Sequence, residues 1–324
     1  MNARIIIVLM TALLALPAQA QTNRQSQKPP AAPAVPPAPA APDGDVAYGA
    51  YQKGNYLTAL VEAQKRMEEK NDPKAMALLA ELYANGLGVP LNEAKAADLY
   101  KRAADRGDRE SMFQLGLMRY GGRGGKRDLA EAARLFTAAA KLGSPPAAYN
   151  LALLYIEGQQ FPQDFARAAE LFRAAAAAGS PEAQYALATL YKEGRGVEKN
   201  PAETARWLAA ATTGGNLEAE VEYAIVLFNG IGIAKDEEKA ARIFLISARR
   251  GNPISQNRMA HILFRGRGLP VSPVQAAQWH MIAKAAGNGD PALDDLVSKM
   301  KPEDRAEAEK LAKPWFDYIA SRSR

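Results

Sequence analysis

The sequence predicts an all-α protein, a solenoid of helix–turn–helix repeats with a period of 36 residues. One series of glycines closes each repeat: Gly107, Gly143, Gly179, Gly215, Gly251 and Gly287. A second series with the same spacing lies in the middle of each repeat: Gly86, Gly122, Gly158, Gly194, Gly230 and Gly266. The composition is rich in alanine and only 7% aromatic, which suits closely packed helices. A period in this range indicates stacked helix pairs that bury their apolar faces against one another.

Residues 1–20 have the pattern of a secretory signal peptide. Arg4 provides a positive charge, an uncharged and mostly apolar run extends from Ile5 to Leu16, and Ala18–Gln19–Ala20 is an A-x-A cleavage motif. The run is shorter than the ~20 residues that a transmembrane helix needs, so we expect export with cleavage and no stable membrane span. The chain has no cysteine, which excludes disulfides and a lipoprotein anchor. Export without cysteine indicates a bacterial periplasm.

Residues 21–42 form a linker in which seven prolines lie among alanines. Such a segment favours an extended polyproline II conformation, at ~3.1 Å per residue, although a disordered spacer with no further role fits equally well. Residues 43–71 are predicted to form a degenerate first helix pair around a turn at Lys53–Gly54–Asn55. An atypical first pair is expected, because the end of a stack needs a polar cap.

Residues 72–287 contain six full repeats, each with a helix A followed by a helix B. Residues that can cap helix A recur at Asp72, Asp108, Ser144, Ser180, Asn216 and Asn252. Residues that can cap helix B recur at Asn92, Asp128, Asp164, Asn200, Asp236 and Ser272. These side chains accept hydrogen bonds from free N–H groups of the first turn. Helix A should end at the mid-repeat glycine and helix B at the closing glycine, with Asn71 in the closing place before the first repeat.

Small and large residues alternate in fixed columns of the repeat. One small column of helix A comprises Ala80, Gly116, Ala152, Ala188, Ala224 and Ala260, and one of helix B comprises Ala97, Ala133, Ala169, Ala205, Ala241 and Ala277. The large columns comprise Leu79, Leu115, Leu151, Leu187, Tyr223 and Met259, and Leu99, Leu135, Leu171, Trp207, Ile243 and Trp279. Small residues that face large ones allow paired helices to approach and interlock.

The pattern A-x-x-x-L-G/A-x-x-Y-x-x-G-x-G-V, a capping residue, and then A-A-x-x-L/W-Y/F-x-x-A-A-x-x-G resembles the Sel-1-like repeat (SLR) family, whose members are related to tetratricopeptide repeats. The segment from Ala183 to Val197 matches the first part almost completely. The chain departs from the pattern where other residues replace the tyrosine or the second loop glycine: Arg119, Leu227, Leu263 and Gln160. The resemblance implies a right-handed superhelical scaffold for protein–protein contacts, of a kind common in bacterial envelopes and signalling.

Residues 288–324 should close the open end of the stack. A short helix is predicted over residues 291–300 and a longer one over 302–320, which carries Trp315, Phe316 and Ile319. A tail that binds a partner is the alternative.

The sequence indicates no catalytic residue, metal site or cofactor. The only two histidines, His261 and His280, lie in distant columns and do not form a metal pair. His280 lies in an aromatic column and should be a packed core residue. The segment from Gly121 to Lys126 resembles a phosphate loop, but no serine or threonine follows the lysine. The net charge of +6 is modest for this length and does not indicate nucleic-acid binding.

A partner should bind where exposed columns are not needed for packing. Residues spaced three and four apart form such a stripe along the A helices, and helix A usually lines the concave side in this architecture. The partner-binding residues we expect on this stripe are Asn150, Glu157, Glu193, Glu222, Asn229, Arg258 and Arg265. The stripe should be acidic around its three glutamates and basic around its two arginines. The alternative is that these side chains only solvate the inner face.

These observations favour a periplasmic, non-enzymatic scaffold or regulator that binds a segment of another envelope protein in a concave groove. A peptidoglycan- or glycan-binding module is the second hypothesis. It ranks lower because the aromatic residues that could stack on sugars mostly lie in packing columns: Trp207, Trp279, Tyr155 and Tyr191. A hydrolase that uses a pair of carboxylates is the third.

Overall fold

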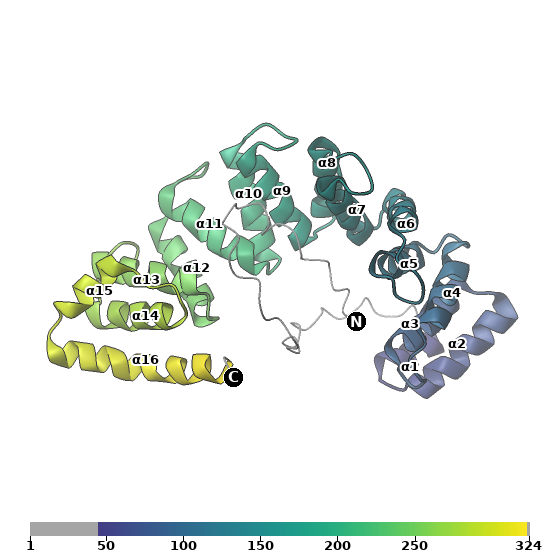
Figure 1. Ribbon diagram of the computed structural model, residues 1–324, viewed down its shortest axis with the longest axis horizontal. Coiled ribbons are helices and arrows are strands. Elements are labelled where there is room, and N and C mark those ends of the chain that lie inside the picture. Colours follow the sequence, from purple (N-terminus) through teal and green to yellow (C-terminus); the bar gives the residue numbers. More distant parts are fainter. Residues whose placement is uncertain (1–44, 323–324) are drawn as a thin grey trace. The chain divides into compact units, whose positions relative to one another are not determined.

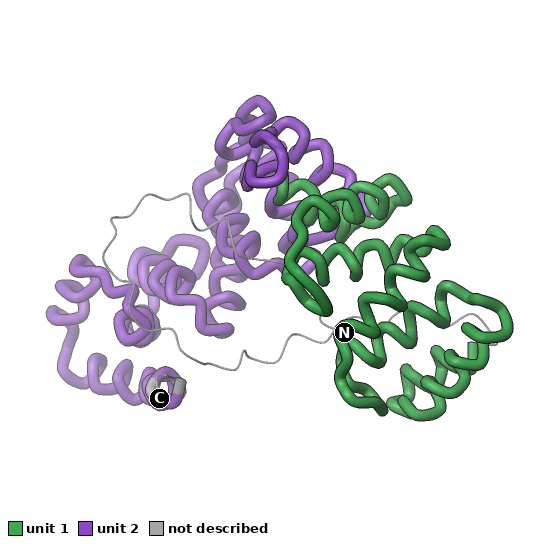
Figure 2. Tube along the Cα trace, turned by 45° about the vertical axis from the view of Figure 1, so that its right-hand side comes forward, with its two compact units in different colours: residues 1–154 green, residues 155–324 purple. Residues whose placement is uncertain are grey.

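The computed structural model describes residues 45–322, and the predicted signal peptide and linker lie outside this range. The described residues form sixteen α-helices and no strand, which confirms the predicted all-α class. The chain divides into two compact units, residues 1–154 and 155–324, which Figure 2 colours green and purple.

Unit 1 contains three helix pairs and most of a seventh helix (Figure 1). These helices are α1 (Val46–Gln52), α2 (Tyr56–Lys70), α3 (Pro73–Asn85), α4 (Glu93–Ala104), α5 (Arg109–Gly121), α6 (Leu129–Lys141) and α7 (Pro145–Glu157).

Unit 2 begins at Tyr155, near the end of α7. Its further helices are α8 (Phe165–Ala177), α9 (Pro181–Glu193), α10 (Pro201–Thr213), α11 (Leu217–Asn229), α12 (Glu237–Arg249), α13 (Pro253–Arg265), α14 (Pro273–Ala285), α15 (Pro291–Ser298) and α16 (Pro302–Arg322). Each of α9, α11 and α13 is the helix A of its repeat.

Capping side chains set the start of most helices, as predicted. Ten of them accept a backbone N–H of the first turn: Asp72, Asn92, Asp108, Asp128, Asp164, Ser180, Asn200, Asn216, Asp236 and Asn252. Such a cap typically stabilises a helix by ~1 kcal/mol. Ser272 is an exception, because its side chain makes no capping bond.

Helix B ends slightly before the predicted position. At Gly179, φ is +91°, and the last helical residue is Ala177. The N–H of Gly179 donates to the carbonyl of Ala176 at 3.0 Å, and that of Ser180 donates to Ala175 at 3.1 Å. These two bonds form a Schellman motif with glycine just outside the helix, so the residue that ends one helix adjoins the cap of the next. Asn71 holds the same kind of place with φ +51°, and is the only non-glycine residue with positive φ in the described chain.

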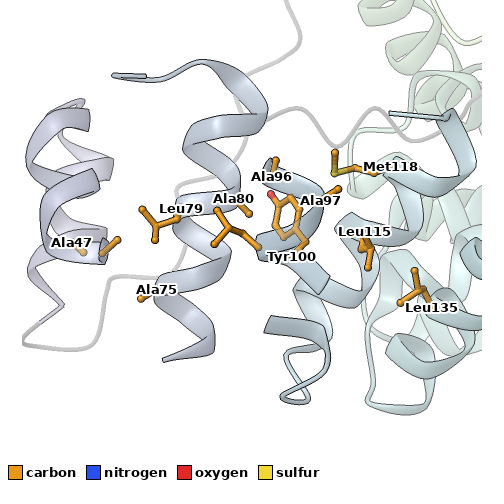
Figure 3. Packing of buried hydrophobic residues seen from close by; sticks show 12 residues of the cluster. Ala47, Ala75, Leu79, Ala80, Ala96, Ala97, Tyr100, Leu115, Met118 and Leu135 are labelled. Carbon is orange, nitrogen blue, oxygen red and sulfur yellow. The ribbon is translucent and has the colours of Figure 1, made fainter. Parts of the chain in front are cut away.

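The predicted columns form the core. In unit 1, Leu79, Ala80, Tyr100, Leu115 and Leu135 belong to one buried cluster that extends from the first helix pair to α6 (Figure 3). In unit 2, the alanines of both small columns are buried, at no more than 2% exposure from Ala188 to Ala277. Small-against-large packing thus repeats along each unit.

At the C-terminal end, α16 packs against α14, as expected for a helix that closes the stack. The rings of Trp279 and Trp315 lie 5.9 Å apart, and the Nε2 of Gln278 donates to the carbonyl of Leu311 at 3.2 Å. Ala308 and Ala312 are fully buried.

Candidate functional site

Asn150 is the predicted site residue that lies in unit 1, and the structure corrects its role. Its side chain is only 3% exposed, and its Nδ2 donates to the carbonyl of Pro146 at 2.8 Å within α7. A buried amide that is bonded to its own helix is not available to a partner. The other six residues lie in unit 2, where Glu157 is partly buried at the end of α7.

Two glutamates of the predicted acidic part, Glu193 and Glu222, are each paired with a basic side chain. Lys192 Nζ lies 2.8 Å from Glu222 Oε2, and the Tyr185 hydroxyl donates to Glu222 Oε1 at 2.8 Å. Arg195 Nη1 lies 3.4 Å from Glu193 Oε2. Burial and the Glu222 carboxylate raise the pKa of Tyr185, so its hydroxyl remains a donor at neutral pH. Glu193 and Glu222 therefore present no uncompensated negative charge, which corrects the predicted charge of this part.

The predicted basic part of the stripe lines a cavity of about 280 Å³ between α11, α12 and α13. Asn229, Arg258 and Arg265 all line this cavity, together with His261 and Ile225. Positions 258, 261 and 265 are three and four residues apart, so they share one face of α13. The structure thus brings together three of the seven predicted residues.

Arg267, which the stripe did not include, completes the cavity wall. Its Nε donates to Glu237 Oε1 at 3.1 Å, and its guanidinium carbon lies 4.3 Å from the centroid of the Phe228 ring. Hydrogen bonds from Arg267 and then Lys235 lower the pKa of Glu237 to about 2. Because Glu237 stays ionised, Arg267 is held in place and its charge is balanced.

Arg258 and Arg265 differ from Arg267. Both are exposed, and within the described residues no hydrogen bond or ion pair engages either guanidinium. Two uncompensated charges therefore border a cavity whose other walls include the apolar residues Ile225, Phe228 and Ile262. This is the chemistry of a site for an anion with an apolar portion.

The two histidines are each paired with an aspartate near α15. His261 Nε2 lies 2.8 Å from Asp290 Oδ2, and this bond is the main factor that lowers the pKa of Asp290. His280 is 1% exposed, as predicted for a core residue, and its Nε2 lies 2.8 Å from Asp294 Oδ1. Neither forms a metal cluster, since no group of three potential ligands occurs among residues 45–322.

A second hollow of about 280 Å³ borders the other side of α11. Lys192, Lys199 and Glu222 line it, and Ile225 lines both hollows. The exposed face of α11 thus forms a ridge with an apolar residue at its centre and basic residues on either side. We call this surface, from α9 across α11 to α13, the α11 face.

Sequence reasoning missed Arg267 and Phe228 because they lie outside the helix A stripe. Arg267 is in the loop that follows Gly266, whereas its partner Glu237 opens helix B of the preceding repeat. The same two places of the repeat pair Arg123 with Glu93. A search for an arginine after the mid-repeat glycine and a glutamate at the start of the preceding helix B would have found the Arg267 pair.

In unit 1, the corresponding helix face contains a buried carboxylate, Glu81. Glu81 is 7% exposed, and it accepts from the Tyr100 hydroxyl at 2.9 Å and from Asn85 Nδ2 at 2.6 Å. Burial raises the pKa of Glu81. Burial and then the nearby Glu81 raise the pKa of Tyr51 to about 12, and the same causes raise that of Tyr100.

We expect the stability of unit 1 to fall as the pH rises above 10. Tyr51 ionises near 10.0 in the unfolded chain and near 12 in the folded one, so its contribution is complete below pH 10 and is lost as the pH approaches 12. Urea unfolding followed by circular dichroism across this window would measure the effect. The Tyr51→Phe/Tyr100→Phe variant should be less stable at neutral pH but should lose less stability across the window. Equal losses would contradict the assignment.

No helix within residues 45–322 has the length and apolar character to cross a membrane.

The Sel1 repeat family model matches six consecutive segments of the chain: residues 73–108, 109–144, 145–180, 181–216, 217–252 and 253–288. The chain belongs to the Sel1 repeat family. This confirms the resemblance drawn from the repeat pattern. Sel1 repeat proteins generally mediate protein–protein interactions, and their solenoid is typically a non-catalytic scaffold.

The solved structures that are similar to this Sel1 repeat protein include the following two. One is a protective antigen of uropathogenic Escherichia coli strains with an SLR fold, at 30% identity and a TM-score of 0.74, which covers 86% of this chain. This chain spans 60% of that antigen's length. The other is a Sel1 repeat protein from Oxalobacter formigenes, at 28% identity and a TM-score of 0.63, with coverage of 74% of this chain and 98% of its own. No curated protein matches.

Proposed function

We propose that this protein is an exported, non-catalytic interaction scaffold or regulator of the bacterial cell envelope, which binds a segment of a partner protein on the α11 face. The observation that carries the proposal is the pair of hollows on either side of Ile225, with uncompensated basic residues at one of them. A central apolar contact with a charged rim is the usual anatomy of a protein-binding surface. Residues 1–20, with their signal-peptide pattern, support export to the periplasm.

Ile225 is the residue to change first, because it is partly buried and lines both hollows. We expect Ile225→Glu to weaken partner capture by about tenfold or more, since it places a charge at the apolar centre of the interface. The measurement is a pull-down from periplasmic extract with immobilised protein, read by mass spectrometry, followed by titration of each retained protein.

Ile246→Glu is the matched control. Ile246 is 47% exposed on α12 and lines neither hollow of the α11 face, so the same substitution there should leave capture unchanged. Circular dichroism would establish that both variants are folded. The proposal fails if wild type retains nothing above background, or if Ile225→Glu and Ile246→Glu capture the partner equally well.

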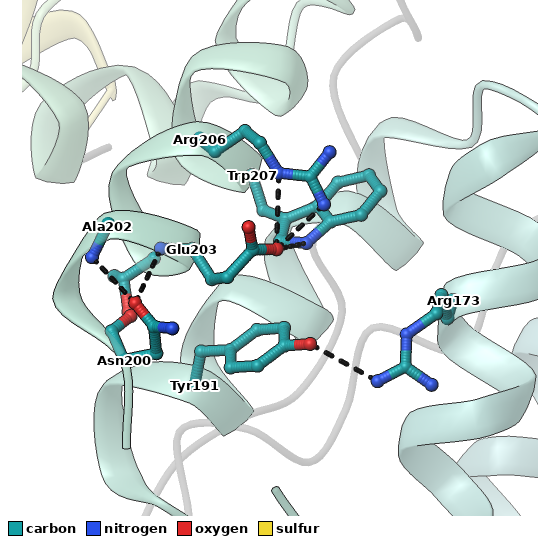
Figure 4. Close-up of polar contacts among 8 residues, drawn as sticks. Arg173, Tyr191, Asn200, Ala202, Glu203, Arg206 and Trp207 are labelled. Atoms are coloured by element: carbon teal, nitrogen blue, oxygen red, sulfur yellow. Dashed lines mark hydrogen bonds and ion pairs between the residues drawn. The ribbon is translucent and has the colours of Figure 1, made fainter. Parts of the chain in front are cut away.

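The glycan-binding alternative has less support from the aromatic residues. Trp207 is 8% exposed, its indole N–H donates to Glu203 at 3.1 Å, and Arg206 stacks on its ring at 4.2 Å. Figure 4 shows these contacts beside the bond from Arg173 to the Tyr191 hydroxyl. Rings engaged in this way do not form an open platform for a sugar. Co-sedimentation with purified peptidoglycan would test this alternative directly.

A further inference from the structure

We propose that the cavity between α11, α12 and α13 is a carboxylate-binding pocket, which holds an acidic group of the partner segment against Arg258 and Arg265. This inference rests on the proposed function and specifies the chemistry of its ligand. The carboxylate belongs either to an aspartate or glutamate side chain or to the C-terminus of the partner.

Some charged groups at the cavity have an ion-pair partner and others do not. Arg267 is satisfied by Glu237, and the carboxylate of Asp290 is satisfied by His261 and by the backbone N–H of Ala292 at 2.9 Å. Arg258 and Arg265 have no such partner among the residues that the structure describes. A guanidinium beside a partly enclosed cavity gains most from a charge-assisted bond with an anion, and its planar fork matches a carboxylate.

The apolar part of the cavity wall should determine which kind of anion binds. Ile225, Phe228 and Ile262 form the apolar part of the cavity wall, beside the polar and basic residues that form the rest. A free phosphate ion cannot use this surface, whereas a carboxylate attached to a hydrocarbon side chain can. The pocket should therefore prefer an amphipathic carboxylate to an inorganic anion.

Small carboxylates test the pocket in the full chain without a known partner. The probes are N-acetylleucine, which mimics a terminal carboxylate, N-acetylglutamic acid α-amide, which mimics a side chain, and neutral N-acetylleucinamide. Saturation-transfer NMR titrations would measure the affinities. At least one carboxylate should bind about tenfold or more tightly than N-acetylleucinamide, and the tighter of the two identifies the source. Inorganic phosphate should compete more weakly.

The Arg258→Glu/Arg265→Glu variant should bind the carboxylate probe about tenfold or more weakly than wild type. Its control is Arg249→Glu/Arg305→Glu, which makes the same change in net charge at two exposed arginines of unit 2 outside the cavity. The control should bind like wild type.

The proposal is overturned if no carboxylate binds, if N-acetylleucinamide or phosphate binds as tightly, or if both double variants bind alike. If partner capture depends on Ile225 but no carboxylate binds, the carboxylate-pocket proposal is rejected and the scaffold proposal stands. If carboxylates bind but no partner is captured, the scaffold proposal is rejected and the carboxylate pocket stands.

Discussion

Replacing Gly196 with alanine should destabilise unit 2 by about 2–5 kcal/mol, the sum of a conformational and a steric cost. Gly196 has φ +70°, a conformation that costs other residues ~1–2 kcal/mol. A Cβ there would also lie 2.1 Å from the carbonyl carbon of Phe165 and 2.5 Å from the nitrogen of Ala166. Both atoms are backbone at the start of α8, so relief requires a shift of the helix itself.

Gly179→Ala separates the two costs. Gly179 also has a positive φ, of +91°, but nothing lies within 4 Å of a Cβ built there. This variant should therefore lose only the conformational part, ~1–2 kcal/mol. Urea unfolding followed by circular dichroism would measure both variants. If Gly179→Ala and Gly196→Ala lost the same stability, the close contact with α8 would make no steric contribution to the loss.

The helix boundaries could be predicted because they depend on local chemistry. A cap such as Asp164 bonds within its own first turn, and a glycine such as Gly194 takes its conformation from its own loop. The reason for glycine at the second loop position could not be predicted from local sequence. Gly196 is required because its loop packs against the backbone of Phe165, which belongs to the preceding repeat.

The candidate site could be predicted only in part, for a related reason. The spacing of Arg258, His261 and Arg265 places them on one helix face, and this is local information. Charge balance is not local, because Lys192 neutralises Glu222 from the preceding repeat. In unit 2 the stripe therefore identified the helix face that lines the two hollows. It assigned free charge to Glu193 and Glu222, which are paired, as well as to Arg258 and Arg265, which have no ion-pair partner among the described residues.

Replacing Phe136 with alanine should destabilise unit 1 by about 3–5 kcal/mol, because its ring is fully buried. The ring also packs closely against Gly116, which interrupts a column of alanines. A Cβ on Gly116 would lie 2.6 Å from Phe136 Cε1. The neighbouring Phe113, whose ring centroid lies 5.9 Å away, limits how far the Phe136 ring can move aside.

The effect of Gly116→Ala on the free energy of unfolding should therefore have opposite signs in wild type and in the Phe136→Ala variant. Alanine is favoured over glycine inside a helix by ~1 kcal/mol, but overpacking against the ring costs ~1–3 kcal/mol, so the single variant should be less stable than wild type. In the Phe136→Ala background the ring is gone and its cavity can accept the methyl group, so the same substitution should stabilise by ~1 kcal/mol. Urea unfolding of the four proteins gives the coupling energy directly. Additive effects would show that the glycine is not needed for the ring, whereas a change of sign would show that Gly116 makes room for the ring of Phe136.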